Sequence, residues 1–287
     1  MLSKASDLAT TVQDLISMPE VCFQVYNIAN DPLCSAVEMA SAIGQDPGLA
    51  VNVLKVANSP YYGFPSRVDT ITRAIAVIGT QDLRELVLAT SIVGAFSSLS
   101  EDVIDLRAFW HHSLLTGLVA RRLGSKAITP VLRRERLFVA GLLHTMGHLV
   151  MATVDPDRYQ KMQEEARNPG VSMSSLEWKY FDCKHTEVAY ELMTAWRLPE
   201  MLRDAALNYL YPENSDDYQL ETSITHVASH FVAAELDLHE PAAADRVSTI
   251  AWKVTGLTPE LVSEALGSSI TEYADVASAF LVNVRTG

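Results

Sequence analysis

Apolar residues recur at helical spacing along almost the whole chain of 287 residues, and no segment alternates apolar and polar residues between turn pairs. Residues three and four apart share one face of a helix, whereas a half-buried strand requires a period of two. The pattern therefore predicts an all-α fold. The expected helices are 6–16, 19–29, 35–45, 48–58, 70–79, 80–96, 105–124, 131–153, 155–167, 174–182, 184–196, 199–210, 221–236, 244–255 and 258–283.

Proline and glycine mark several of the expected helix ends. Asp46-Pro47 should begin a helix, and the sequence from Asn58 to Gly63 should end it in a sharp turn. The best candidate for a boundary within the chain is the short polar stretch 97–102. We therefore predict one continuous unit with an N-terminal helical lobe at residues 1–97 and a helical bundle at residues 98–287.

Three aromatic residues follow the expected turn after Asn58, namely Tyr61, Tyr62 and Phe64. Aromatic side chains at a helix junction usually fill the interface between helices, so we predict that they fill the lobe interface. An exposed contact surface is the alternative.

The expected helix 105–124 is apolar on nearly all sides, which places it inside the bundle and leaves His111 and His112 little route to solvent. In the expected helix 131–153, Gly141, His144 and His148 share one stripe. Because Gly141 lacks a side chain, a neighbouring helix can approach closely there.

His226 and His230 form a second pair at helical spacing. Neutral imidazoles on an inward face can bind a transition metal, and the alternative is a set of buried histidines hydrogen-bonded to the protein. We favour the second interpretation, because no carboxylate nearby in the sequence completes either pair. No phosphate-binding loop, nucleophile elbow or convincing Cys-His pair competes with these histidines.

The net charge of −13 argues against nucleic acid as a partner, and residues 199–287 carry 14 acidic against four basic side chains. Segment 121–136 is the exception, with six basic residues and one acid. Arg133, Arg134 and Arg136 stand where a helix should begin, and positive charge is unfavourable there. They form either a docking patch for a partner or a solvated helix end.

The sequence gives no sign of a membrane protein. No N-terminal segment has the pattern of a signal peptide, and no apolar stretch approaches the roughly 20 residues that span a bilayer. We expect a cytoplasmic protein.

Several motifs resemble those of HDOD domains, a signalling branch of the HD-domain phosphohydrolase superfamily. In the N-terminal third they are Met18–Val21, Ile43–Leu49, Val56–Gly63 and Thr72–Gly79, and further on Phe109–Ser113, Ala140–Leu149, His185–Val188 and Ala195–Pro199. The resemblance covers nearly the whole chain. It implies an HD-type helical bundle with an N-terminal helical lobe.

The resemblance also implies where a metal site would lie. His112 and His144 match the first histidine and the histidine of the His-Asp doublet, but Thr145 stands in place of the doublet aspartate. The downstream acid falls at Ser229, and the basic residue after the doublet becomes His148. His185 matches a further ligand of the dinuclear branch, whose later histidine pair is replaced by Asn208-Tyr209.

Hydroxyls at both carboxylate positions leave a divalent ion short of ligands and of negative charge. We therefore expect a non-enzymatic bacterial regulatory module without a metal cofactor, whose partner is a signalling protein or a second copy of itself. The alternative is a phosphohydrolase that uses Fe, Mn or Zn and an atypical histidine-rich ligand set, in which His148, His226 and His230 are possible extra ligands. A third possibility is a sensor that binds a small molecule in the former active-site cavity.

Overall fold

The computed structural model describes residues 4–16, 18, 20–30, 35–97, 99–127, 134–168, 170–236 and 243–281. Every regular element in these ranges is a helix, which confirms the all-α prediction. The helices are α1 (Lys4–Leu15), α2 (Glu20–Asn30), α3 (Ala36–Gly44), α4 (Pro47–Ala57), α5 (Ile71–Ile78), α6 (Thr80–Ala95), α7 (Leu106–Leu123), α8 (Arg134–Leu143), α9 (Gly147–Val154), α10 (Pro156–Ala166), α11 (Met173–Phe181), α12 (His185–Ala195), α13 (Glu200–Asn208), α14 (Gln219–Leu236), α15 (Thr249–Thr255) and α16 (Pro259–Phe280), with the short 3₁₀ helices η1 (Pro212–Asn214) and η2 (Ala243–Asp245).

The helix ends follow from local side-chain chemistry. Asp46 accepts a hydrogen bond from the backbone N–H of Leu49 at 3.0 Å and precedes Pro47, so α4 begins where the sequence predicted. At its other end, the Asn58 side chain bonds both the backbone N–H and the carbonyl of Val68, at 2.8 and 2.7 Å. Gly63 takes a φ of 60°, which suits the turn that follows.

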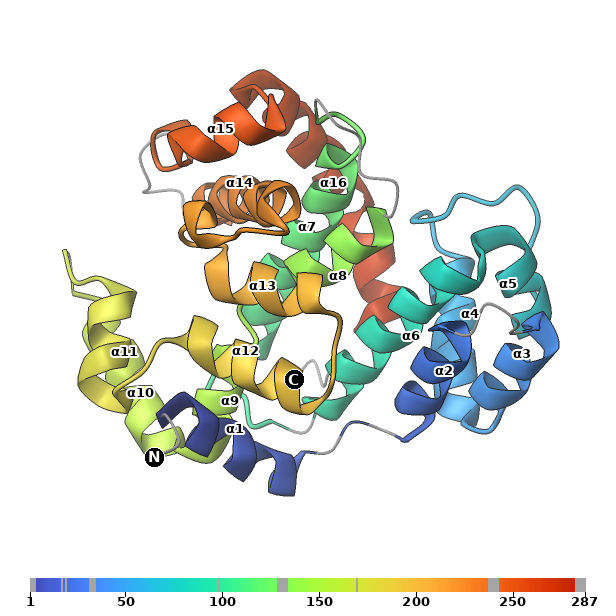
Figure 1. Ribbon diagram of the computed structural model, residues 1–287, viewed down its shortest axis with the longest axis horizontal. Helices are drawn as coiled ribbons and strands as arrows, with labels where there is room; N and C mark the ends of the chain where they lie inside the picture. Colours follow the sequence, from blue (N-terminus) through green and yellow to red (C-terminus); the bar gives the residue numbers. More distant parts are fainter. Residues whose placement is uncertain are drawn as a thin grey trace.

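Helix α7 runs through the bundle and packs against α8, α14 and α16 (Figure 1). Its Trp110, Leu114 and Val119 side chains have no exposed surface, as the apolar pattern predicted. His111 and His112 both keep part of their surface exposed, and His111 packs on Tyr273, with ring centroids 4.2 Å apart. The expectation that both histidines have little route to solvent is therefore only partly met, because neither is fully buried.

Helices α2–α5 form a group to one side of the molecule, and α6 connects them to α8 (Figure 1). Helix α1 lies apart from that group and packs on α9 and α12. The division at residues 97/98 stays a prediction. Tyr61 is 5% exposed and contacts Phe138 of α8 and Phe280 of α16, which confirms that it fills an interface.

The expected helix 131–153 is interrupted. Its first three residues lie outside the described residues, α8 ends at Leu143, and α9 begins at Gly147. The Nδ1 atom of His144 lies 2.7 Å from the carbonyl oxygen of Gly141, the acceptor that the N–H of Thr145 would use in a continuous α-helix. The N–H of Met146 bonds Leu143 instead, three residues back, at 3.0 Å. His144 and Thr145 therefore lie in a tight turn between two helices.

Residues 134–154 form a segment of 21 residues that is long and apolar enough to cross a membrane, contrary to the sequence expectation. The expectation missed it because it was based on uninterrupted apolar runs, whereas this segment carries scattered polar residues. Of its most apolar window, 78% is buried inside the protein, which is the burial of a core segment.

Candidate functional site

His112 and His144 meet where α7, the α8–α9 turn and α14 come together. Their ring centroids lie 5.2 Å apart. The Nε2 atom of His144 is 3.0 Å from the hydroxyl of Ser229 on α14, and His112 donates to the backbone carbonyl of the same serine. The sequence thus grouped three residues that the fold brings together.

Thr145 lies at the same junction, and its hydroxyl is 3.2 Å from that of Ser113 on α7. Close packing of α7 against α8 makes this contact possible. A Cβ atom on Gly141 would come within 2.7 Å of the backbone of Gly117, so both helices require glycine at the crossing. The predicted close approach at Gly141 is confirmed.

Burial keeps the two imidazoles at this junction neutral. It lowers the pKa of His112 to about 4, although the bond to the Ser229 carbonyl partly opposes the shift. Burial also holds the pKa of His144 well below its usual value, and a charge on His112 would lower it further.

These four side chains do not fit a divalent ion of the HD type. They offer two imidazoles and two hydroxyls, and they include no carboxylate to balance the charge of an ion. Both ring nitrogens of His144 already have protein partners, namely Gly141 and Ser229. An ion on His144 would first have to displace one of these hydrogen bonds.

A second cluster lies beside the first and contains His148, His185 and a residue that the sequence analysis missed, Glu177 of α11. The carboxylate of Glu177 accepts from Nδ1 of His185 at 2.7 Å and from its backbone N–H at 3.2 Å. Nε2 of His148 is 3.5 Å from the same carboxylate. The two imidazoles stack, with centroids 4.3 Å apart and planes 16° from parallel.

Burial and neighbouring groups shift the pKa values of Glu177 and His148 in the second cluster. Burial alone would raise the pKa of Glu177, but the hydrogen bonds from His185, with the attraction of any positive charge on His185 or His148, outweigh it and bring the pKa below its usual value. Burial lowers the pKa of His148 to about 3. Tyr209 stands where the family resemblance implies a metal ligand. Its hydroxyl lies 2.8 Å from Nε2 of His185, so both ring nitrogens of His185 have a partner in the protein.

His226 has a structural role, because both of its ring nitrogens form hydrogen bonds within the protein. Its Nδ1 donates to the backbone carbonyl of Tyr209 at 2.6 Å, and its Nε2 accepts from the N–H of Ser248 at 2.9 Å. The imidazole thus connects α14 to the end of α13 and to the start of α15. His230 packs against it, with ring centroids 4.4 Å apart, and its pKa is lowered by burial to about 4.

The predicted basic patch is divided. Arg133 lies outside the described residues, and Arg134 is exposed at the start of α8. Arg136 departs from the expected solvated position, because its Nε lies 3.2 Å from the carboxylate of Glu85 on α6, whose side chain is only 2% exposed. The docking patch stays a prediction, and Arg134 is its exposed member within the described ranges.

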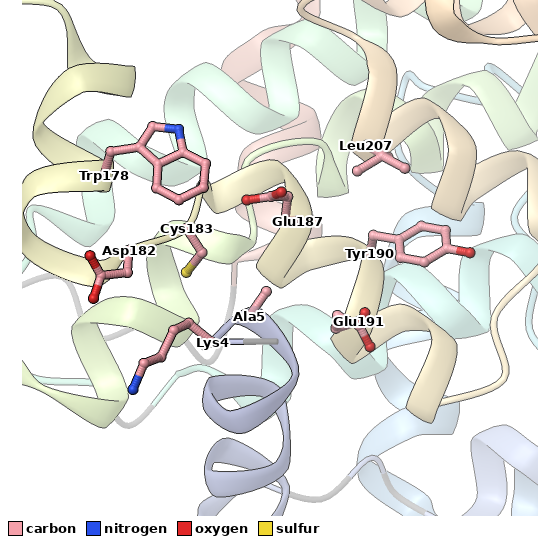
Figure 2. Close-up of a pocket in the computed structure, with 9 residues that line it drawn as sticks. All are labelled: Lys4, Ala5, Trp178, Asp182, Cys183, Glu187, Tyr190, Glu191 and Leu207. Atoms are coloured by element: carbon pink, nitrogen blue, oxygen red, sulfur yellow. The ribbon is translucent and has the colours of Figure 1, made fainter. Parts of the chain in front are cut away.

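Figure 2 shows a pocket of about 290 Å³ between α1 and the turn from α11 to α12. Trp178 stands at its edge and is 50% exposed. The acidic residues around it are Asp182, Glu187 and Glu191. The pocket therefore has an aromatic and acidic lining of a kind that sequence periodicity did not indicate.

The described residues form an all-helical protein whose histidines meet at a helix junction. The family model of the HDOD domain matches residues 15–211, which is more than half of the chain. The chain belongs to the HDOD domain family.

Solved structures share this fold over nearly the whole chain. An HDOD domain protein with unknown function from Geobacter sulfurreducens has a TM-score of 0.74 at 22% identity, and the match covers 96% of this chain and 98% of the other. A candidate phosphohydrolase from Shewanella amazonensis SB2B has a TM-score of 0.75 at 21% identity, covering 95% and 97%. A candidate signal transduction protein from Marinobacter aquaeolei VT8 has a TM-score of 0.76 at 20% identity, covering 96% of this chain and 61% of the other. At these identities the similarity concerns the fold.

A curated relative, an uncharacterized protein of Treponema pallidum (strain Nichols), is 23% identical over 216 residues, which are 75% of this chain. The match spans 41% of that relative.

Proposed function

We propose that this chain is a non-enzymatic, cytoplasmic bacterial signal-transduction module that acts by binding another protein or a second copy of itself. The observation that carries this proposal is the pairing of Thr145 with Ser113 and of Ser229 with His144. Where HD hydrolases hold an ion through carboxylates, hydroxyls here complete hydrogen bonds within the protein.

Hydrolysis of a phosphoester by HD enzymes depends on a bound ion that lowers the pKa of water and orients it. Neutral hydroxyls are weak ligands for such an ion and supply no charge to offset it. His112 and His144 alone leave this junction without an agent for activating water.

Exposed aromatic residues support the second half of the proposal. Trp178 and Tyr211 are 50% and 49% exposed, and Lys184, between them in sequence, lies 5.5 Å from the centre of the Tyr211 ring. Aromatic side chains are enriched in protein interfaces relative to other surfaces. Trp178 in α11 and Tyr211 after α13 therefore offer exposed aromatic contacts that do not belong to the histidine junction.

Purified chain should be assayed against nucleotides, cyclic dinucleotides and generic phosphoesters with Mn²⁺, Fe²⁺ or Zn²⁺. We expect no hydrolysis above a metal-free control. Metal-dependent turnover that His144→Ala abolishes would contradict the proposal and favour the histidine-rich phosphohydrolase. Turnover that survives His144→Ala but is lost in Glu177→Gln would place that activity at the second cluster.

A further inference from the structure

Three side chains from separate elements converge in the second cluster: His148 near the start of α9, Glu177 in α11 and His185 at the start of α12. Each offers one ligand atom, and these atoms all lie within 4.8 Å of one another. Ligand atoms bound about 2.1 Å from one ion lie at most about 4.2 Å apart, so a small contraction of the cluster accommodates an ion.

We propose that His148, Glu177 and His185 bind one divalent transition-metal ion, at a position distinct from the His112–His144 junction. Two imidazoles and one carboxylate are a ligand set of protein zinc sites, with water as the fourth ligand. The carboxylate also supplies the negative charge that the junction lacks. The inference does not depend on the proposed signalling function.

His148 can become a ligand without losing a protein hydrogen bond. Its Nδ1 is buried and has no hydrogen-bond partner among the described residues. Its Nε2 has the 3.5 Å approach to Glu177, which is longer than an N–H···O hydrogen bond. Nε2 faces the Glu177 carboxylate, so it is the His148 atom that can share an ion with Glu177 without the loss of a hydrogen bond.

His185 can become a ligand by a shift of one proton. In the present arrangement its Nδ1–H donates to Glu177 and its Nε2 accepts from the Tyr209 hydroxyl, 2.8 Å away. If the proton leaves Nδ1 and one is taken up at Nε2, then Nδ1 is free to bind the ion and Nε2–H donates to the Tyr209 oxygen. Metal-bound histidines usually donate their second N–H in this way. Tyr209 is thus a positioning residue.

The backbone holds two of the ligands together before any ion binds. A Cβ atom on Gly147 would come within 1.9 Å of the carbonyl oxygen of His185, so the start of α9 rests directly on the start of α12. The ion would be enclosed, because Glu177 has no exposed surface and the His148 side chain is 14% exposed. It would fasten α9, α11 and α12 to one another.

The test uses the full chain, stripped with a chelator and dialysed, and titrated with Zn²⁺ in a calorimeter and with Co²⁺ by visible absorption. We expect one ion per chain. Glu177→Gln and His148→Gln should each lose this binding. Tyr209→Phe should weaken the affinity by about 10–100-fold, because it removes the partner of a ligating histidine.

His230→Gln is the matched control, since His226 and His230 are the competing histidine pair. It should bind Zn²⁺ as the parent does. The inference is overturned if the parent binds no ion, or if His230→Gln loses as much affinity as Glu177→Gln. Circular dichroism establishes that each variant is folded, and should Glu177→Gln not fold, the less buried His148→Gln decides.

Binding and hydrolysis separate this inference from the proposed function. Zn²⁺ binding without turnover supports both. Zn²⁺-dependent turnover lost in Glu177→Gln supports the site and contradicts the non-enzymatic role. If the chain shows neither Zn²⁺ binding nor turnover, that result contradicts the proposed ion site and leaves the proposed non-enzymatic function standing.

Discussion

At the residue scale, the buried histidines make the stability of the metal-free protein depend on pH. Burial lowers the pKa of His148 to about 3 and that of His112 to about 4, whereas both have a pKa near 6.5 when unfolded. Between these values the unfolded chain binds more protons than the folded one. Stability is therefore fully present above about pH 6.5 and is lost as the pH falls toward 4.

We predict that the melting temperature in metal-free buffer falls steadily from pH 7 to pH 5. Each histidine that is neutral when folded and protonated when unfolded contributes a slope of at most about 1.4 kcal/mol per pH unit. Glu177 stays ionised over this range, because its pKa lies below its usual value. His148→Gln should flatten the slope, and a variant with the slope of the parent would show that His148 is not buried as described.

The sequence could identify His112, His144 and Ser229 as neighbours because the family pattern fixes their places. It could not identify Glu177, which lies eight residues before His185 in a different helix. That helix carries exposed residues beside it, including Trp178, and the carboxylate meets His148 of α9 and His185 of α12 only in the folded chain. Burial of a single charged residue leaves no periodic signal.

At the element scale, helix types and most boundaries followed from periodicity and capping residues, but the break between α8 and α9 did not. Apolar spacing continues through residues 144–146, so no stop signal is present. The break arises because the His144 side chain takes the carbonyl of Gly141. That bond depends on the position of the imidazole against α14, which is a tertiary effect.

The crossing of α7 and α8 yields a prediction with an internal control. Gly141→Ala would place a Cβ atom within 2.7 Å of the Gly117 backbone, and the helices would have to separate. We expect a loss of about 1–3 kcal/mol in the free energy of unfolding. Gly267 lies in α16, where an added Cβ atom would meet no neighbouring atom within 4 Å. Gly267→Ala should therefore raise the free energy of unfolding by about 0.5–1 kcal/mol. Urea denaturation measures both, and equal effects would contradict the close crossing.

At the scale of the whole molecule, buried polar contacts join the N-terminal helices to the bundle. Glu85 of α6 pairs with Arg84 and with Arg136 of α8. Near Tyr61, Glu135 accepts from the tyrosine hydroxyl and from Nε of Arg121, the latter at 2.7 Å. Such buried charges are costly to leave unpaired. Arg136 therefore acts in the fold, and Arg134 is the better test of a docking patch.

We predict that Arg136→Ala lowers the free energy of unfolding by about 1–2 kcal/mol, because Glu85 loses one of its two cationic partners. Arg134→Glu should change it by less than about 0.5 kcal/mol and should weaken capture of partner proteins, or self-association, at moderate salt. Urea denaturation and capture are measured on the same preparations. Unchanged capture and self-association by folded Arg134→Glu would show that this arginine is solvated surface.

The proposed function requires that Thr145 and Ser229 occupy the positions of two lost carboxylates. Restoring these carboxylates tests that requirement, as Thr145→Asp with Ser229→Asp, in a Glu177→Gln background that disables the second cluster. Without metal, the added buried carboxylates should lower the melting temperature, because desolvated like charges repel.

The decisive measurement is the melting temperature of this triple variant and of Glu177→Gln alone, each with and without Mn²⁺ or Fe²⁺. We predict that the ion restores the melting temperature of the triple variant, as a ligand of the folded state must, and leaves Glu177→Gln unchanged. If the ion stabilises neither protein, or both equally, Thr145 and Ser229 are not the vacated ligand positions.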